Sequence, residues 1–414
     1  MDKAAKRRTW IGIIVLLFAN SAAGGAEWCS SALADIAGTF PEVPYSVITL
    51  VNNIPNLCAV VFTLVAGLLV NRRISLRAMI IIGIGLHAVG GVMPALLGEH
   101  SITIMFLGRF AFGIGYGLMQ GIGISMSFKL VENEKLRVHA MGWAVAAQYS
   151  MNMVAQVVVG RLVEIQWNYA FFIYAWSFIP FLVAVFLCPR FPIDKSDYSA
   201  LGGSNSVLAQ KGSVWNSIRH LPKNVWIFTV IVALYMLCYY PLFLVISPII
   251  IDRGLGTAAT AGDAMVFYSI ATIIGGMVFG AAEKVLRHWT LAAFLIGVAA
   301  SLIGLYFAQS FAMVCFWLVI SGSFSDQASI LTPTGIIPGC INVYNNQVDD
   351  SDAFLATGIT ESGVNIGAFL TTPFIAVIES TGGTAVQSLL YTPVALVIMA
   401  FITAWCCKRA GTKQ

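Results

Sequence analysis

Residues 101–128 read SITIMFLGRFAFGIGYGLMQGIGISMSF, an apolar run with a single charged residue, Arg109. About 20 apolar residues are enough to cross the hydrocarbon core of a bilayer. The run therefore predicts a membrane-spanning helix. A charge at the bilayer centre costs roughly 2.5–3.5 kcal/mol even on lenient insertion scales, so such residues are rare and usually functional. Arg109 is thus a first candidate for a functional site.

The whole chain shares this apolar character. Of its 414 residues, 58% are hydrophobic and only 10% are charged, and the mean hydropathy is +0.83. A soluble domain has about 25% charged residues. So few polar residues could not cover the surface of a soluble protein of this length. We therefore expect lipid to be the solvent for much of the surface.

Windows of about 20 apolar residues predict an all-α membrane protein with twelve membrane-spanning helices. Charged or turn-forming residues separate neighbouring spans. The predicted spans are 11–34, 46–70, 76–97, 101–128, 137–163, 168–188, 224–250, 261–282, 288–308, 311–334, 353–378 and 385–407. The longest polar stretch, 189–223, is predicted to be a cytoplasmic linker. It divides the chain into two six-helix bundles, residues 1–188 and 224–414, with a central cavity between them.

The positions of Lys and Arg predict the orientation, because cytoplasmic loops of membrane proteins carry an excess of both. With the N-terminus inside, all but three of the 23 Lys and Arg residues fall in cytoplasmic segments. The exceptions are Arg109 and Arg161 within spans and Arg253 in an outer loop. Both termini are therefore predicted to be cytoplasmic. The absence of any Asn-x-Ser/Thr sequon favours a bacterial inner membrane, and the first span is expected to be retained.

Three further charged residues interrupt predicted spans: Glu27, Asp326 and Glu361. At about 1.5 Å per residue, Glu27 lies about 25 Å from the inner end of its span, and Arg109 lies about 12 Å below the outer end of its own. Asp326 and Glu361 lie about 12–14 Å from the inner edge. A buried carboxyl group can exchange a proton when its burial and charged neighbours change. We therefore predict that all four residues take part in proton coupling, with Arg109 biasing the protonation of Glu27. Static ion pairs or hydrogen-bonded acids are the alternative.

Polar residues at helical spacing form one-sided stripes in four of the spans. Such stripes face the bundle interior or a water-filled cavity rather than lipid. A packing seam between helices is the alternative. The stripes are Asn20, Gly24, Glu27 and Ser31; Arg109, Gly113, Tyr116 and Gln120; Gln148, Asn152 and Gln156; and Thr357, Glu361 and Asn365.

Aromatic residues in the seventh and eighth spans add to this candidate cavity. Pro241 is predicted to kink the seventh span, next to Tyr239 and Tyr240, of which at most one is expected to face the cavity squarely. Tyr268 is a candidate in the eighth span. The predicted substrate-binding residues are Asn20, Glu27, Arg109, Tyr116, Gln120, Gln148, Asn152, Tyr239, Tyr240, Tyr268, Asp326, Glu361 and Asn365.

Two segments of the first half resemble motifs of the major facilitator superfamily. The run from Gly108-Arg109 to Gly117 is similar to the family's fourth-helix motif, an Arg followed by glycines. The segment 67–77, GLLVNRRISLR, resembles the cytoplasmic loop motif after the second helix, with Asn71 where an Asp is usual and Ile74 where a Gly is usual. The resemblance implies a gating role for this loop. The residues that would carry it are Gly67, Asn71, Arg72, Arg73 and Arg77.

The resemblance implies a monomeric secondary active transporter that works by alternating access, as a symporter or an antiporter. Three acids and one Arg lie deep in the spans, which favours a small neutral, zwitterionic or cationic organic solute with proton coupling. One alternative is a multidrug/proton antiporter, because Glu27, Asp35 and Arg109 resemble one branch of such exporters. Another is a carrier of a small organic monoanion that uses Arg109. No nucleophile motif, metal-ligand cluster or phosphate loop occurs in the sequence, so we expect no enzyme, cofactor, metal or nucleic-acid partner.

Overall fold

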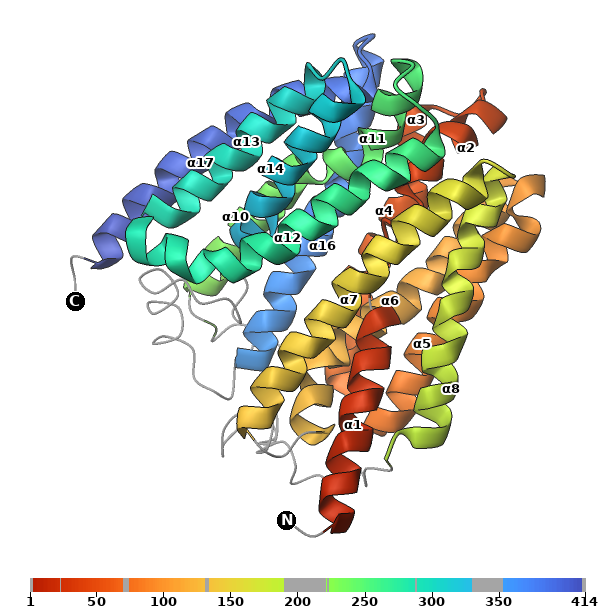
Figure 1. The fold of residues 1–414 in the computed structure, drawn as a ribbon, viewed down its shortest axis with the longest axis vertical. Helices are drawn as coiled ribbons and strands as arrows, with labels where there is room; N and C mark the ends of the chain where they lie inside the picture. Colours follow the sequence, from red (N-terminus) through yellow and green to blue (C-terminus); the bar gives the residue numbers. More distant parts are fainter. Residues whose placement is uncertain are drawn as a thin grey trace.

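The computed structural model describes residues 3–22, 24–69, 74–130, 134–189, 221, 223–286, 289–329 and 353–411, and these are almost entirely helical (Figure 1). The first half contains α1 Lys3–Ala22, α2 Leu33–Thr39, α3 Tyr45–Ile48, α4 Leu50–Leu69, α5 Leu76–Leu97, α6 Ile102–Leu130, α7 Glu134–Val163 and α8 Phe178–Leu187, with 3₁₀ helices η1 Ser30–Ala32, η2 Gly98–His100 and η3 Trp167–Ser177. The second half contains α10 Lys223–Tyr239, α11 Pro241–Asp252, α12 Ala258–Leu286, α13 Thr290–Tyr306, α14 Phe311–Ser329, α16 Ala353–Ser380, η6 Ala385–Gln387 and α17 Ser388–Gly411.

Seven helical segments in the described part of the chain are long and apolar enough to cross a membrane. They are Leu76–Leu97, Ile102–Gln120, Trp167–Leu187, Val225–Asp252, Ala258–Gly275, Ile359–Ser380 and Ala385–Trp405. Four shorter apolar helices accompany them: Thr9–Ala22, Leu50–Ala66, Thr290–Tyr306 and Phe311–Ser325. The predicted all-α membrane architecture is therefore confirmed, while the division into twelve spans stays a prediction.

The helices form two groups (Figure 1). In the first group α6 packs against α4 and α5, and α1 packs against α7. In the second group α10 packs against α16, α12 against α14, and α13 against α17. Consecutive long helices run in opposite directions, so the turns after α2, α5, α7, α11, α13 and α16 gather at one end, here called the distal end. The opposite end, which carries the N-terminus, is here called the terminal end.

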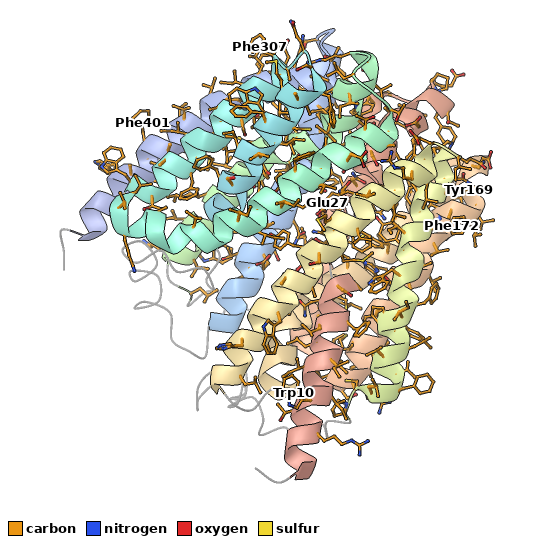
Figure 2. The ribbon with its side chains drawn as sticks, viewed as in Figure 1. Trp10, Glu27, Tyr169, Phe172, Phe307 and Phe401 are labelled. Atoms are coloured by element: carbon orange, nitrogen blue, oxygen red, sulfur yellow. The ribbon has the colours of Figure 1, made fainter. Side chains whose placement is uncertain are left out.

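The outer surface of both groups is apolar. Figure 2 shows Trp10, Phe172, Phe307 and Phe401 pointing away from the helices, and between 37% and 64% of each of these side chains is exposed. Burying a side chain of this size stabilises a protein in water by about 1.5–3 kcal/mol, so exposing many of them to water would be unfavourable. Such a surface suits a lipid environment.

Helix α6 lies in close contact with two neighbours because its glycines leave room on two sides. A methyl group added at Gly113 would meet Pro55 Cα of α4 at 2.7 Å, and one at Gly117 would meet Ala59 Cα at 2.8 Å. One added at Gly108 would meet Pro94 Cδ of α5 at 2.9 Å. Small residues allow backbones to approach closely in membrane helices. The glycines of α6 thus set the packing of α4, α5 and α6 around Arg109.

The prediction of one continuous helix over 11–34 is wrong. Helix α1 ends at Ala22, and the chain continues through turns to η1 and α2. Gly25 has φ of 104°, a left-handed conformation that residues with a Cβ atom rarely adopt. The predicted stripe of Asn20, Gly24, Glu27 and Ser31 therefore does not exist as a helix face. In the seventh span, by contrast, the predicted effect of Pro241 is confirmed, because α10 ends at Tyr239 and α11 begins at Pro241.

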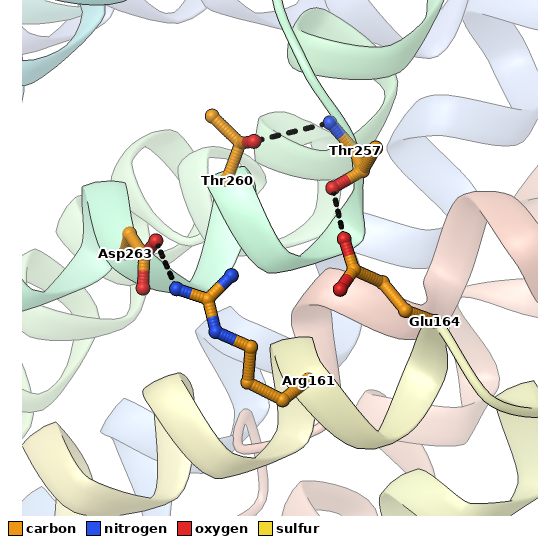
Figure 3. Close-up of polar contacts among 5 residues, drawn as sticks. All are labelled: Arg161, Glu164, Thr257, Thr260 and Asp263. Atoms are coloured by element: carbon orange, nitrogen blue, oxygen red, sulfur yellow. Dashed lines mark hydrogen bonds and ion pairs between the residues drawn. The ribbon is translucent and has the colours of Figure 1, made fainter.

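The two groups contact each other along α4 and α16 and along α7 and α12. In Figure 1, α7 and α12 lie close together near the distal end and diverge toward the terminal end. Figure 3 shows the distal contacts of this pair, in which Arg161 Nη2 lies 2.7 Å from Asp263 Oδ2 and the Thr257 hydroxyl donates to Glu164 Oε1 over 2.6 Å. The Thr257 N–H also donates to Thr260 Oγ1 over 3.2 Å at the start of α12.

Further inter-group bonds follow α4 and α16 from the distal end inward. The Ser46 N–H donates to the Glu379 carboxylate, with both oxygens 3.2 Å away. The Thr49 and Thr372 hydroxyls lie 2.8 Å apart, and Asn53 Nδ2 donates to Thr372 Oγ1 over 2.6 Å. The described distal ends of the two groups are therefore joined by polar bonds over several turns.

Candidate functional site

A cavity of about 180 Å³ lies between the two groups. Its wall takes side chains from α4, α6 and α7 of the first group and from α10, α11, α12, α14 and α16 of the second. The lining residues are Glu27, Asn56, Tyr116, Gln148, Tyr149, Asn152, Gln156, Tyr235, Met236, Tyr239, Tyr240, Phe243, Met265, Tyr268, Ser269, Ser325, Val364, Asn365 and Ala368. Among these described residues, Glu27 is the only one with a charged side chain.

Glu27 reaches the cavity from the interrupted stretch between α1 and η1 (Figure 2). The backbone carbonyl of Glu27 stabilises the turn ahead of η1, because it accepts the Ser30 N–H over 3.0 Å and the Ser30 hydroxyl over 2.6 Å. Non-helical backbone at membrane depth is tolerated only where protein buries it or where it lines a cavity. The break in the first span thus has a direct consequence, because it presents Glu27 to the space between the groups.

Arg109 lies beside this stretch but does not line the cavity. Its side chain is 0% exposed. Its Nε donates to the Val51 carbonyl over 2.6 Å, and its Nη2 donates to the Ala26 carbonyl over 2.8 Å. The guanidinium carbon lies 4.3 Å from the centre of the Phe112 ring, a favourable cation–π position. No ion pair joins Arg109 to Glu27 among the described residues, so a direct pair between these two charges is absent.

Helix α7 supplies the amide side of the cavity. Gln148, Asn152 and Gln156 all line it, as their four-residue spacing predicts. Asn152 Oδ1 also accepts the indole N–H of Trp28 over 2.7 Å. The amides therefore both face the cavity and contact the interrupted stretch.

Aromatic residues dominate the opposite wall. Tyr239 and Tyr240 both line the cavity; that at most one of them faces it squarely stays a prediction. They diverge in their contacts, because the Tyr239 ring stacks on Tyr235 at 5.5 Å whereas the Tyr240 hydroxyl accepts a bond from Asn56 Nδ2 over 3.0 Å. The helix break at Tyr240 places this turn at the cavity wall. The third predicted tyrosine here, Tyr268, also lines the cavity, with its hydroxyl 3.1 Å from Ser325 Oγ.

The remaining predicted residues near the cavity belong to α6 and α16. Tyr116 and Asn365 line it, while Gln120 and Glu361 do not. Asn365 Nδ2 donates to Gln120 Oε1 over 3.0 Å and to the Glu361 carbonyl over 2.9 Å. The first of these bonds joins the two groups beside the cavity.

Other predicted residues lie away from the cavity or outside the description. Asn20 does not line the cavity. Its Nδ2 donates to the Leu16 carbonyl of its own helix over 2.9 Å. In the loop motif, Arg77 Nη2 donates to the Val185 carbonyl over 2.5 Å. Several predicted residues have undescribed side chains or lie outside the described residues: the Asp326 and Thr357 side chains, Asn71, Arg72, Arg73 and most of the linker 189–223. Gly67 lies in the last turn of α4.

Several lining residues are not predicted by the sequence pattern, among them Asn56, Tyr149, Tyr235 and Phe243. The run VNNIPN, residues 51–56, was a usable signal for Asn56, because three amides within an apolar span are costly unless they are bonded. The aromatic residues carried no such signal, since aromatic side chains occur throughout the apolar spans.

Comparison with known proteins assigns the architecture to a family. The family model of the Major Facilitator Superfamily matches residues 9–321, from within α1 to within α14, which is well over half of the chain. A search of curated proteins found no match. The match covers the interrupted stretch, Arg109 and most of the cavity wall. The chain belongs to the Major Facilitator Superfamily and is a secondary transporter that crosses the membrane several times.

Proposed function

We propose that this transporter moves a small organic solute through the cavity by alternating access, and that Glu27 couples the movement to protons. The observation that carries the proposal is the position of Glu27, the one charged side chain among the described lining residues, at the seam between the two helix groups. Neutral, zwitterionic and cationic solutes fit this wall better than anions do. We also propose that the chain has twelve spans in two bundles, residues 1–188 and 224–414, joined by the linker 189–223.

Alternating access requires two packings of the groups around one site. The described contacts concentrate at the distal end, as at Arg161–Asp263 and Ser46–Glu379. These contacts support a conformer that is closed at that end. In the opposite conformer the distal bonds would break and the groups would close at the terminal end. Asn365–Gln120, which joins the groups beside the cavity, is a candidate for a contact that changes during this step.

The surroundings of Arg109 and the composition of the cavity wall bear on the two alternative functions, a monoanion carrier and a multidrug/proton antiporter. Arg109 is fully buried and bonded to two backbone carbonyls, so the monoanion carrier that relies on it receives no support from the geometry. A multidrug/proton antiporter is favoured by a specific observation, namely that the aromatic residues Tyr116, Tyr235, Tyr239, Tyr240 and Phe243 line the cavity together with a single acid among the described residues. Such a wall would accept varied hydrophobic cations through dispersion and cation–π contacts. A resistance profile toward such cations on expression distinguishes this function from transport of one nutrient.

The test of coupling compares Glu27→Gln with Glu42→Gln. Glu42 is exposed at the distal end, so its variant controls for the loss of a carboxylate as such. A ligand screen by thermal shift on the purified protein first supplies a solute. Its transport is then measured in proteoliposomes with and without an imposed proton gradient. We expect Glu27→Gln to lose gradient-driven accumulation and Glu42→Gln to retain it. Full gradient-driven accumulation in Glu27→Gln would refute the assignment of Glu27.

A further inference from the structure

The interrupted stretch Gly24–Glu27 has lost the regular helical pattern of hydrogen bonds, because α1 ends at Ala22. Backbone carbonyls at membrane depth need partners, since no water is available in the hydrocarbon core. Backbone N–H groups supply only two of these partners, from Trp28 to the Gly25 carbonyl over 3.4 Å and from Ser30 to the Glu27 carbonyl over 3.0 Å, and side chains supply the others. Each of the four successive carbonyls accepts a bond from a side chain of a different element of the first group.

The first two carbonyls are bonded by residues of α5 and η3. His87 Nε2 lies 3.3 Å from the Gly24 carbonyl, and the Tyr174 hydroxyl donates to the Gly25 carbonyl over 2.6 Å. A carbonyl oxygen can only accept, so Nε2 of His87 carries the hydrogen. In the neutral ring Nδ1 is then the acceptor, and the Ser177 hydroxyl, 2.9 Å away, donates to it. Ser177 thereby fixes the tautomer that His87 needs.

The next two carbonyls are bonded by residues of α6 and α7. Arg109 Nη2 donates to the Ala26 carbonyl over 2.8 Å, and Gln156 Nε2 donates to the Glu27 carbonyl over 3.4 Å. His87 and Arg109 are fully buried, and 3% of Gln156 is exposed. The four donors His87, Tyr174, Arg109 and Gln156, here called the carbonyl cradle, thus come from four different elements and converge on one short stretch.

We infer that the carbonyl cradle consists of positioning residues, which hold the backbone of Gly24–Glu27 and so set where the Glu27 carboxylate lies in the cavity. All four donors belong to the first group, so Glu27 is fixed to that group while the opposite wall belongs to the second. Movement of the groups then changes the surroundings of the carboxylate without moving its backbone. This role deepens the proposed function and rests on the assignment of Glu27 as the coupling residue.

The test measures Glu27 directly and needs no solute. Dicyclohexylcarbodiimide modifies protonated carboxyl groups in apolar surroundings, and mass spectrometry of the purified full-length protein quantifies the adduct at each residue. The variant Tyr174→Phe removes one cradle donor and keeps its ring, which stacks on Trp28 at 5.4 Å. The variant Ser177→Ala removes the group that orients His87 and serves if Tyr174→Phe fails to fold. Labelling rates are recorded across pH, because titratable or charged groups interact electrostatically with Glu27: Arg109 and Tyr116 of α6, and Tyr240 between α10 and α11.

We expect the labelling rate of Glu27 to change by about fivefold in each variant, as an increase or a decrease. A factor of about five corresponds to the net free energy of one ordinary hydrogen bond. Tyr169→Phe is the matched control, because Tyr169 lies on the same element η3 and points outward in Figure 2. Glu361, a carboxyl group of the second group, is the internal reference and should keep its rate.

Two outcomes overturn the inference. One is an unchanged Glu27 rate in both variants. The other is an equal change at Glu27 and Glu361, which would indicate general loosening rather than a displaced carboxylate. The proposed function fails separately: if Glu27→Gln keeps full proton-driven transport, the coupling assignment is lost, while the labelling result still decides whether the cradle positions this side chain.

Discussion

At the scale of single residues, the two charges that lie together in the first group have different surroundings. Glu27 faces the cavity, whereas Arg109 is enclosed by carbonyls and aromatic rings. A buried charge is tolerated when hydrogen bonds satisfy it. The hydrogen bonds of Arg109 go to backbone oxygens of Ala26 and Val51, so they hold the interrupted stretch and the start of α4, and neither reaches the Glu27 carboxylate.

Gly25 makes the interruption possible, and its replacement tests this. Its φ of 104° is unfavourable for other residues, and an added Cβ would meet Trp28 Cδ2 at 2.8 Å. The left-handed conformation alone costs an L-residue roughly 1–2 kcal/mol. We expect Gly25→Ala to lower the thermal unfolding midpoint of the purified protein by several degrees and to reduce transport.

Gly38→Ala is the control for the Gly25 prediction. Gly38 lies within α2, and an added Cβ there would meet nothing within 4 Å. Alanine is favoured over glycine inside a helix by roughly 0.5–1 kcal/mol. This variant should keep or raise the unfolding midpoint. Equal midpoints for the two variants would show that the Gly25 conformation imposes no special requirement.

At the scale of helices, the contact between α7 and α12 holds the distal ends together. Close approach is possible because Gly160 and Gly262 face the partner helix: an added Cβ at Gly160 would meet Ala259 Cα at 2.9 Å, and one at Gly262 would meet the Gln156 carbonyl oxygen. The ion pair of Arg161 and Asp263 lies at the same contact, with side chains 56% and 37% exposed. Exposed pairs contribute about 0–1 kcal/mol, so packing should matter more than charge here.

Gly262→Val should therefore force α7 and α12 apart and favour a conformer open at the distal end. Spin labels at Glu42→Cys and Gln309→Cys, exposed residues of the two groups, report the separation by double electron–electron resonance. The mean distance should increase in the Gly262 variant.

Arg161→Ala is the comparison for the same measurement. Removing one partner of this exposed pair should shift the distance distribution only slightly, because the free-energy change is about 1 kcal/mol or less. A larger shift in Arg161→Ala than in Gly262→Val would mean that charge, not helix packing, closes the distal end.

At the scale of the whole molecule, the protein has an apolar exterior and a polar seam. Exposed side chains such as Phe186 and Phe401 cover the outside, while Asn53, Asn56 and Thr372 are bonded within the seam. The arrangement follows from the solvent, because lipid accepts apolar groups and leaves polar groups to pair with one another. The proposed alternating access would require the two halves to exchange the bonds of this seam.

The predicted orientation gives a test at this scale. Single cysteines at Glu42 and Gly382 report on the distal end, and one at Arg7 reports on the terminal end, in a background without native cysteines. Membrane-impermeant maleimide added to intact cells should label the distal cysteines and leave the Arg7 cysteine unlabelled until the cells are opened. Labelling of the Arg7 cysteine in intact cells would contradict cytoplasmic termini, which the distribution of Lys and Arg predicts.

The helical periodicity of polar residues in the sequence predicts much of the candidate site, as the amide side chains of α7 show. Gln148, Asn152 and Gln156 lie on one face of an unbroken helix, and all three line the cavity. Periodicity failed where the helix is broken. Asn20 and Glu27 were assigned to one face, but the break after Ala22 separates them. The pair Gly24-Gly25 was the available signal for this break, since adjacent glycines weaken a helix.

Composition and apolar run length by themselves determined that the chain is a helical membrane protein, because a residue's transfer free energy into lipid depends on its own chemistry. The sequence also predicted that Glu27 and Arg109 lie at compatible depths in the first half. Only the tertiary structure decided which of them faces the cavity. In that structure four donors far apart in sequence, His87, Tyr174, Arg109 and Gln156, converge on the four consecutive carbonyls that end at Glu27. Such convergence is a property of helix packing, which spacing along one helix cannot encode.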